Sequence, residues 1–316
     1  MKLFRYIRSL VLLSLPLIGG HIAQILIGVG DTLIVGRYSS EALAALVLGT
    51  TIFFVIFIFG AGFSFAAMAL ISTANTEDDT TKIRRITRMA LWLSLAFGLV
   101  VSPFFVFSEW LLLLLGQEAN LAVLASRYLI FAGIAIFPAL GSSVLRCYLA
   151  GMEHVKVTFY ISIIAVLLNL LINSLLVFGL LGLPELGIIG AGVATVFVNL
   201  FMFISFLFYA KIKLPNHNLF VRFWKPDHGA IGLVLKMGSA IGITSLAEAG
   251  LFSASSIMMG WVGQLELAAH GIALQLASIT FMLHLGLSDA ATIKVSAALG
   301  KIDKPQIINE CWAALV

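Results

Sequence analysis

The feature that most constrains this chain is a series of long apolar stretches separated by short polar connections. A helix needs about 20 mostly apolar residues to cross a membrane, and eight stretches of this kind can be found in the sequence. Hydrophobic residues make up 61% of the chain and charged residues only 11%, which is too apolar a composition for one water-soluble core. We therefore predict an all-α polytopic membrane protein. The predicted spans are Leu10–Val35, Leu43–Ala74, Met89–Leu115, Leu121–Ala150, Val157–Leu181, Gly187–Ala210, Ala230–Val262 and Leu267–Ala298.

The two ends of the sequence lead to separate expectations. The first apolar stretch follows a basic start, but it is long and lacks a small-residue cleavage site, so we do not expect a cleaved signal peptide. Another apolar run begins at Cys311 and continues to Val316. We expect a ninth span to start there and the chain to be C-terminally truncated.

Positive charges are distributed unevenly between the two sets of connections. With the N-terminus placed in the cytoplasm, 17 of the 19 Lys and Arg residues fall on the cytoplasmic side, and only Arg37 and Arg127 fall outside. This bias predicts a multi-pass protein of the bacterial inner (plasma) membrane with a cytoplasmic N-terminus. Because the basic residues lie in the connections between spans, we attribute them to membrane orientation and expect no nucleic-acid partner.

A polar linker and an internal repeat divide the predicted spans into two sets. A shift of 224 residues pairs Gly62 with Gly286 and Ser72 with Ser296, in one register across two spans and a loop. Both copies would start in the cytoplasm, so the repeat is parallel, as in one class of secondary transporters. The predicted organisation is an N-terminal six-helix bundle (1–210), a cytoplasmic linker (211–229) and an incomplete second bundle (230–316).

Three acidic residues lie well inside the predicted spans, where each costs roughly 2.5–3.5 kcal/mol to insert. Asp31 precedes the outer end of the first span, and Gln24 lies seven residues earlier on the same helix face. Glu248 lies near the middle of the seventh span, and the repeat places it on Gln24. We predict that Asp31 and Glu248 bind a proton or a cation inside the membrane. Asp289 lies close to the cytoplasmic end of its span, so we interpret it as an interfacial acid.

Other polar residues in the spans allow two interpretations. Asn169 and Asn173 are four residues apart, so their side chains could offer oxygens to a hard cation or hold two helices together. Thr195 could add an oxygen to such a site. His21, His270 and Gln275 stand alone in their spans, which favours helix contacts over ligand binding. The sequence has no nucleophile paired with a base and no nucleotide-binding loop, so we expect no enzymatic activity.

Several motifs resemble the MATE (multidrug and toxic compound extrusion) family, in particular its bacterial norfloxacin-efflux branch. The first is Gln24-x-x-x-Gly28-x-x-Asp31-Thr32-x-x-x-Gly36, followed by Leu43-Ala44-Ala45. The second is Leu267-Ala268-Ala269-His270 with Gln275, in the second repeat. The resemblance implies two six-helix bundles around a V-shaped cavity.

By this resemblance, Asp31, Asn169, Asn173 and Thr195 match the cation or proton cluster of the first bundle, and Glu248 matches the acid of the second. If the coupling ion is Na+, the resemblance makes Asp31, Asn169 and Asn173 its ligands. Gln24, His270 and Gln275 become candidates for the substrate cavity.

The implied function is export of amphiphilic, often cationic, drugs or dyes in exchange for Na+ or H+. The expected partners are these small molecules and membrane lipid, with no cofactor beyond the coupling ion and with the chain acting as a monomer. Two alternatives remain open at this point, which are a flippase for lipid-linked precursors and an inactive truncated membrane protein.

Overall fold

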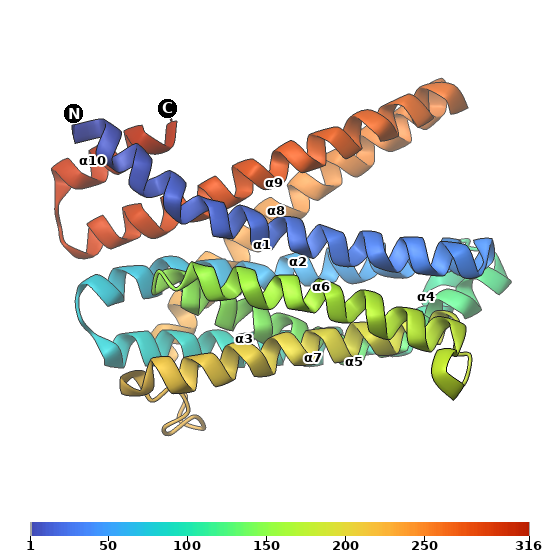
Figure 1. Ribbon diagram of the computed structural model, residues 1–316, viewed down its shortest axis with the longest axis horizontal. Coiled ribbons are helices and arrows are strands. Elements are labelled where there is room, and N and C mark those ends of the chain that lie inside the picture. The colour runs from blue at the N-terminus through green and yellow to red at the C-terminus, as the bar shows by residue number, and fades with distance from the viewer. Residues whose placement is uncertain (1, 316) are drawn as a thin grey trace.

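The fold of the 316-residue chain is known from a computed structural model that describes residues 2–315. Within this range, the side chains of residues 2, 256, 257, 260–262, 264–268, 272 and 275 are not described. The described chain consists of helices and their connections (Figure 1). The elements are α1 (Lys2–Tyr38), α2 (Ser40–Thr76), α3 (Thr80–Val106), α4 (Ser108–Leu114), α5 (Ala119–Gly151), α6 (Val155–Phe178), η1 (Leu180–Gly182), α7 (Ile188–Lys213), η2 (Pro215–His217), α8 (His228–Val262), α9 (Gln264–Gly300) and α10 (Lys304–Leu315).

Eight helices of the described chain are long and apolar enough to cross a membrane, as the sequence predicts. The third predicted span differs from the structure in one respect, because it comprises two helices. Pro103 lies inside α3 and lacks a backbone N–H, and α3 ends three residues later. Phe107 then leaves the helical conformation, and the short helix α4 follows.

The local sequence explains where several helices begin and end. Ser39 caps α2, because its hydroxyl accepts hydrogen bonds from the backbone N–H groups of Glu41 and Ala42. Asp79 caps α3 in the same manner through the N–H of Lys82. At the end of α6, Gly179 adopts the left-handed conformation that stops many helices (φ +66°). These caps set the short connections between the spans.

The centre of the molecule is α5, which packs against α2, α3 and α7. Its buried side chains include Tyr128 and Tyr148, and small residues such as Ala132 let neighbouring helices approach closely. On the outer side of this core, α1 packs along α6 (Figure 1). The six spanning helices α1, α2, α3, α5, α6 and α7 therefore enclose a common interior.

The last two long helices meet this bundle along only part of their length. The beginning of α8 packs on α2, and the end of α9 packs on α1 and α2. The two helices α2 and α8 cross closely at Gly62, where an added Cβ would lie 2.4 Å from the Gly238 carbonyl oxygen. Beyond this contact, α8 and α9 run side by side away from the bundle (Figure 1). Leu251 and Leu276, on the departing parts, are 71% and 65% exposed.

The contact between α2 and α9 lies at one end of the molecule, which we call the basic end. It contains the α2–α3, α5–α6 and α9–α10 connections (left in Figure 1), and basic residues such as Lys82, Lys156 and Lys304 lie in the helices next to them. Three α2 hydroxyls donate hydrogen bonds to α9 carbonyls there, and we call this set the basic-end contact. Its bonds run from Ser72 to Ile293 (2.7 Å), from Thr73 to Ser296 (3.1 Å) and from Thr76 to Ala297 (3.0 Å).

The linker between α7 and α8 is fastened to the basic end of the bundle. His217 is buried, and its Nδ1 lies 2.6 Å from the Tyr148 hydroxyl. Arg88 of α3 donates a hydrogen bond to the Arg222 carbonyl at 2.7 Å, and Trp92 donates one to the Phe223 carbonyl at 3.0 Å. The linker therefore follows the surface of the bundle through specific polar contacts.

Candidate functional site

The candidate site is built around Asp31, whose carboxylate is buried between α1 and α6. Asp31 belongs to α1 and is 5% exposed. Its Oδ1 accepts hydrogen bonds from the side-chain amides of Asn169, at 2.9 Å, and Asn173. Both asparagines belong to α6 and are fully buried. The three predicted polar residues therefore meet in one cluster.

The local sequence explains why this cluster forms. Asn169 and Asn173 are one helical turn apart, so both amides face α1. Gly30 precedes Asp31, and a Cβ at this position would lie 2.7 Å from Leu170 Cδ2 and 3.2 Å from Asn169 Oδ1. The missing side chain at Gly30 thus lets α1 and α6 approach closely enough for the carboxylate to reach the amides.

Two oxygen atoms in the cluster have no hydrogen-bond partner. Asn169 Oδ1 and Asn173 Oδ1 are both buried and unpaired, although a buried polar atom without a partner is costly. These amide oxygens and the Asp31 carboxylate are the kinds of ligand that hard cations prefer. The cluster therefore offers one negative charge and two free oxygens to a small cation, or one carboxylate to a proton.

The structure adds Tyr128 of α5 to this cluster. The sequence analysis did not identify this tyrosine. The phenol is buried beside Thr195 of α7 and lies near enough to Asp31 to interact with it electrostatically. Its ring occupies space left by Gly49 of α2, where a Cβ would lie 2.6 Å from Tyr128 Cδ1. The signal available in the sequence was a tyrosine inside an apolar span, and its meaning depended on a glycine of a different helix.

Thr195 lies beside the cluster and makes no described hydrogen bond to Asp31. Its hydroxyl donates to the Ala191 carbonyl of its own helix at 2.9 Å and contacts the Tyr128 phenol. The residue is therefore adjacent to the carboxylate through Tyr128.

Other predicted site residues lie apart from the Asp31 cluster. The side chains of Gln24 and Glu248 are both exposed in the described chain, so neither joins the Asp31 cluster. The reason is that α8 touches α2 at Gly238 and Gly242, whereas at Gly250 no neighbouring atom lies within 4 Å of an added Cβ. His270 lies 3.2 Å from the Ser255 hydroxyl and joins α9 to α8. The Gln275 side chain lies outside the described residues.

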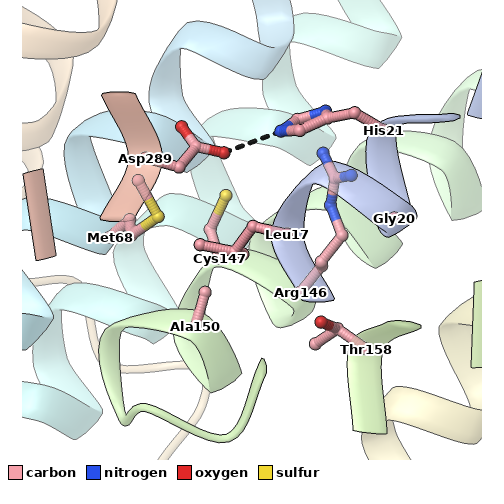
Figure 2. A pocket seen from close by; sticks show the side chains of 9 residues that line it. All are labelled: Leu17, Gly20, His21, Met68, Arg146, Cys147, Ala150, Thr158 and Asp289. Carbon is pink, nitrogen blue, oxygen red and sulfur yellow. Dashed lines mark hydrogen bonds and ion pairs between the residues drawn. The ribbon is translucent and has the colours of Figure 1, made fainter. Parts of the chain in front are cut away.

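Asp289 also departs from the sequence interpretation. It is 8% exposed, and its Oδ2 lies 2.8 Å from His21 Nε2 of α1, as Figure 2 shows. The interpretation of Asp289 as an interfacial acid is therefore wrong. Lys294, which the sequence places beside it, pairs instead with Glu153 at 2.9 Å.

A comparison with protein families identifies the chain. The family model described as MatE matches residues 16–175 and 240–310. The chain belongs to the MatE family. The first matched segment contains the Asp31 cluster apart from Thr195, and the second contains most of α8 and all of α9. Members of this family are transporters, which supports a function other than enzymatic catalysis.

Relatives of this MatE-family chain carry a multidrug resistance name. It is 44% identical over 308 residues to the "Probable multidrug resistance protein NorM" of Agrobacterium fabrum, covering 97% of this chain and 66% of the relative. It is 42% identical to the protein of the same name from Rhizobium meliloti, covering 98% and 67%. The chain thus spans about two thirds of the length of these curated relatives.

A solved structure also resembles this MatE-family chain. The crystal structure described as "MATE in the bent conformation" superimposes with a TM-score of 0.87 at 20% identity. The match covers 100% of this chain and 71% of that one. At this level of identity, the likeness concerns the fold of the protein.

Proposed function

We propose that this MatE-family protein is a secondary multidrug efflux transporter, in which a cation bound at the Asp31 cluster drives the export of amphiphilic, often cationic, compounds. The observation that carries the proposal is the buried Asp31 carboxylate beside the two unpaired amide oxygens of Asn169 and Asn173. An acid enclosed within a membrane bundle needs a functional partner, because its burial is costly. The NorM names of the relatives are consistent with this role.

The cluster supports coupling with either Na+ or H+. Without a cation, the carboxylate is stabilised by two N–H donors. Rotation of the Asn169 and Asn173 amides would turn their oxygens toward a Na+ ion next to Asp31, whereas a proton would neutralise the carboxylate directly. Either event changes how α1 is held against α6, so cation binding can change the substrate affinity through linkage.

The remaining parts of the proposal concern orientation and substrate contact. The basic end faces the cytoplasm of the bacterium, because Lys and Arg residues are retained on that side of a membrane. Residues 1–210 act as one bundle and residues 230–316 as part of a second, joined by the cytoplasmic linker 211–229. Amphiphilic compounds bind between the bundles, where Gln24, His270 and Gln275 are candidate contacts. The Glu248 carboxylate serves as the acid of the second bundle, and the chain acts as a monomer.

The first test measures cation binding to the 316-residue chain itself. We expect Na+ or acidification to raise the melting temperature in detergent relative to choline at neutral pH, because a ligand stabilises the state that binds it. Asp31→Asn should abolish this increase while leaving the helical content unchanged. Thr32→Ala is the matched control, because Thr32 is the next residue, is exposed and bonds only within its own helix. An increase that persists in Asp31→Asn would refute the cation site.

The second test measures ethidium export from proteoliposomes under an imposed Na+ or H+ gradient. We expect the chain to export ethidium with one of the two gradients, and Asp31→Asn to reduce the initial rate at least tenfold. Export that is unchanged in Asp31→Asn would refute coupling at this residue. Cation binding without any export by the parent chain would identify the alternative of a non-transporting membrane protein.

A further inference from the structure

A second buried titratable pair lies where α9 crosses α1. His21 comes from the middle of α1 and Asp289 from the second half of α9, so the pair joins residues 268 positions apart in the sequence. The helices approach closely here, because a Cβ at Gly286 would lie 2.5 Å from the Ile18 side chain. His21 Nε2 and Asp289 Oδ2 are 2.8 Å apart (Figure 2). The pair therefore holds the incoming α9 to the first bundle.

This pair is the most enclosed contact between an acidic and a basic side chain among the described residues. The side chains of His21 and Asp289 are 5% and 11% exposed. Each of the three Lys or Arg ion pairs in the described part of the chain has one partner that is at least 41% exposed. Water therefore screens the other pairs, whereas the charge on His21 and Asp289 depends on their immediate neighbours.

The neighbours form a small cavity beside the pair. Its volume is about 10 Å³, which is roughly the space for one water molecule. From α5, Arg146 and Cys147 face this cavity, and the Arg146 side chain extends toward His21 (Figure 2). The lining residues from α2 and α6 are Met68 and Thr158, which do not titrate. Arg146 is thus the one permanent cation facing the pair among the described lining residues.

Charged groups farther along the same helices are engaged elsewhere. Lys294 of α9 pairs with Glu153 in the α5–α6 connection. Glu310 of α10 interacts with these same two residues. The acid Glu77 at the end of α2 pairs with Lys82. The charge of the cavity is therefore set by His21, Asp289 and Arg146.

A count of charges indicates how a proton would act on this cavity. An ionised carboxylate can only accept hydrogen bonds, so Nε2 of His21 carries the hydrogen in the pair. With neutral His21, ionised Asp289 and cationic Arg146, the cluster has no net charge. One added proton leaves a net charge of +1 in a space that holds about one water molecule, and such a charge is poorly hydrated there. Separation of α9 from α1 would let water reach this charge.

We propose that His21 and Asp289 form a second proton-binding site, separate from Asp31, whose protonation opens the contact between α1 and α9. The site lies between the first bundle and the α8–α9 pair, on the path that must open if the basic-end contact is to break. It rests on the proposed transport function, because opening of this end would give the substrate access from the cytoplasm. Protons arriving from that side would then promote opening, and their loss would favour closure.

The test measures the distance across the basic end as a function of pH. Spin labels are placed at Lys213→Cys and Lys301→Cys, two exposed positions at the ends of α7 and α9, in a Cys311→Ser background that retains buried Cys147. Pulsed electron resonance between about pH 5 and pH 9 should show a longer distance whose population grows on acidification. A distance distribution that does not change with pH would overturn the proposal.

Three variants identify the groups that bind the proton. His21→Gln keeps a donor for Asp289 but cannot titrate, so the short distance should persist at every pH. Arg146→Gln removes the permanent cation, so a proton on His21 no longer leaves a net positive charge and the longer distance should not appear on acidification. Asp289→Asn leaves Arg146 without an anion, so the longer distance should be populated even at high pH.

His284→Gln is the matched control, because His284 is exposed on the same helix and bonds only to the Thr280 carbonyl of that helix. It should leave the transition unchanged. A transition that survives in His21→Gln with the same midpoint would overturn the assignment to His21. Asp31→Asn separates the two proposals, because it should leave the distance transition intact while coupling at Asp31 is lost. Persistent export in Asp31→Asn would therefore count against the proposed function alone.

Discussion

The first repeat, α1 to the start of α3, and the second repeat, α8 to α10, have the same local structure. The shift that the sequence predicts places Ser40–Thr76 of α2 on Gln264–Gly300 of α9, so that both helices begin and end at equivalent positions. It also reproduces the turn that follows. Asp78 and Ile302 both adopt a positive φ, of 54° and 56°, and Asp79 and Asp303 accept hydrogen bonds from the N–H groups of Lys82 and Gln306. Short-range sequence therefore dictates the same helices and the same turn twice.

The two repeats differ in how much of each helix is buried. In α2, buried residues extend from Ala42 to Ala74, because α3, α5, α8 and α9 all pack against it. In α9, the buried residues among those described begin only at Gly286. Ser64 of α2 is fully buried, whereas its equivalent, Ser288 of α9, is exposed. Equal sequence patterns thus give unequal environments, because burial is decided by the neighbouring helices.

The position of the acidic residue differs between the repeats as well. Asp31 of α1 corresponds to Ser255 of α8, and Glu248 of α8 corresponds to Gln24 of α1. The two acids are therefore displaced by two helical turns relative to each other. Asp31 meets the amides of α6, whereas Glu248 is exposed. The difference indicates that the repeats share a scaffold but place their acidic residues at different positions along it.

The largest expected effect comes from the close crossings between the repeats. Gly62→Ala would bring a Cβ against the Gly238 and Gly242 backbone, and Gly286→Ala would bring one against Ile18. We expect each change to lower the free energy of unfolding by about 1–3 kcal/mol, the usual cost of overpacking. Thermal and denaturant unfolding in detergent measure this loss. Gly250→Ala is the control, because an added Cβ there has open space around it and should cause no loss. Equal destabilisation by all three changes would show that the loss does not come from close helix crossings.

The equivalent turns test whether the repeats are locally independent. Asp79→Ala and Asp303→Ala each remove one helix cap, and we expect each to lower the free energy of unfolding by about 1 kcal/mol. The double variant should lose the sum of the two values, because the caps share no partner. Asp79→Asn and Asp303→Asn are the controls, since asparagine also caps helices. A cap effect at only one of the two turns would show that the local likeness does not extend to stability.

A smaller effect is expected in the basic-end contact, where α2 donates and α9 accepts. Thr76→Val keeps the shape of the side chain and removes the hydrogen bond to the Ala297 carbonyl. Hydrogen bonds between membrane helices contribute about 0.6 kcal/mol on average, so we expect a loss of this size in the free energy of unfolding. Thr32→Val is the control, because the Thr32 hydroxyl bonds only to Gly28 of its own helix. The same loss in both variants would argue against a role for the contact between helices.

The smallest expected effect concerns pH and the linker that connects the repeats. Burial lowers the pKa of His217 below its ordinary value of 6.5, and the neighbouring His154 acts in the same direction. Because the folded state disfavours the protonated form, stability should be constant above about pH 6.5 and fall as the pH decreases below it. His217→Gln, which can still hydrogen-bond to Tyr148, should flatten this part of the profile in thermal unfolding. An unchanged slope in this variant would assign the pH dependence to another group.

Much of the fold follows from the sequence, because each span is encoded locally. Apolar length predicted the eight membrane-spanning helices, and the repeat shift predicted the correspondence between the two pairs of helices. The sequence also suggested that Asp31, Asn169 and Asn173 are functional polar residues, and the structure joins them by hydrogen bonds. It could not predict Tyr128, because the place of its ring depends on the absence of a side chain at Gly49 of another helix.

By itself, the amino-acid sequence determined which segments form membrane helices, where the basic charges lie, and that a helix pair occurs twice. Only the tertiary structure decided that Asp289 is buried against His21 and that Glu248 is exposed. The physical reason is that apolarity and spacing are properties of one helix. The burial of an acid depends on which helices pack around it and how closely their small residues let them approach.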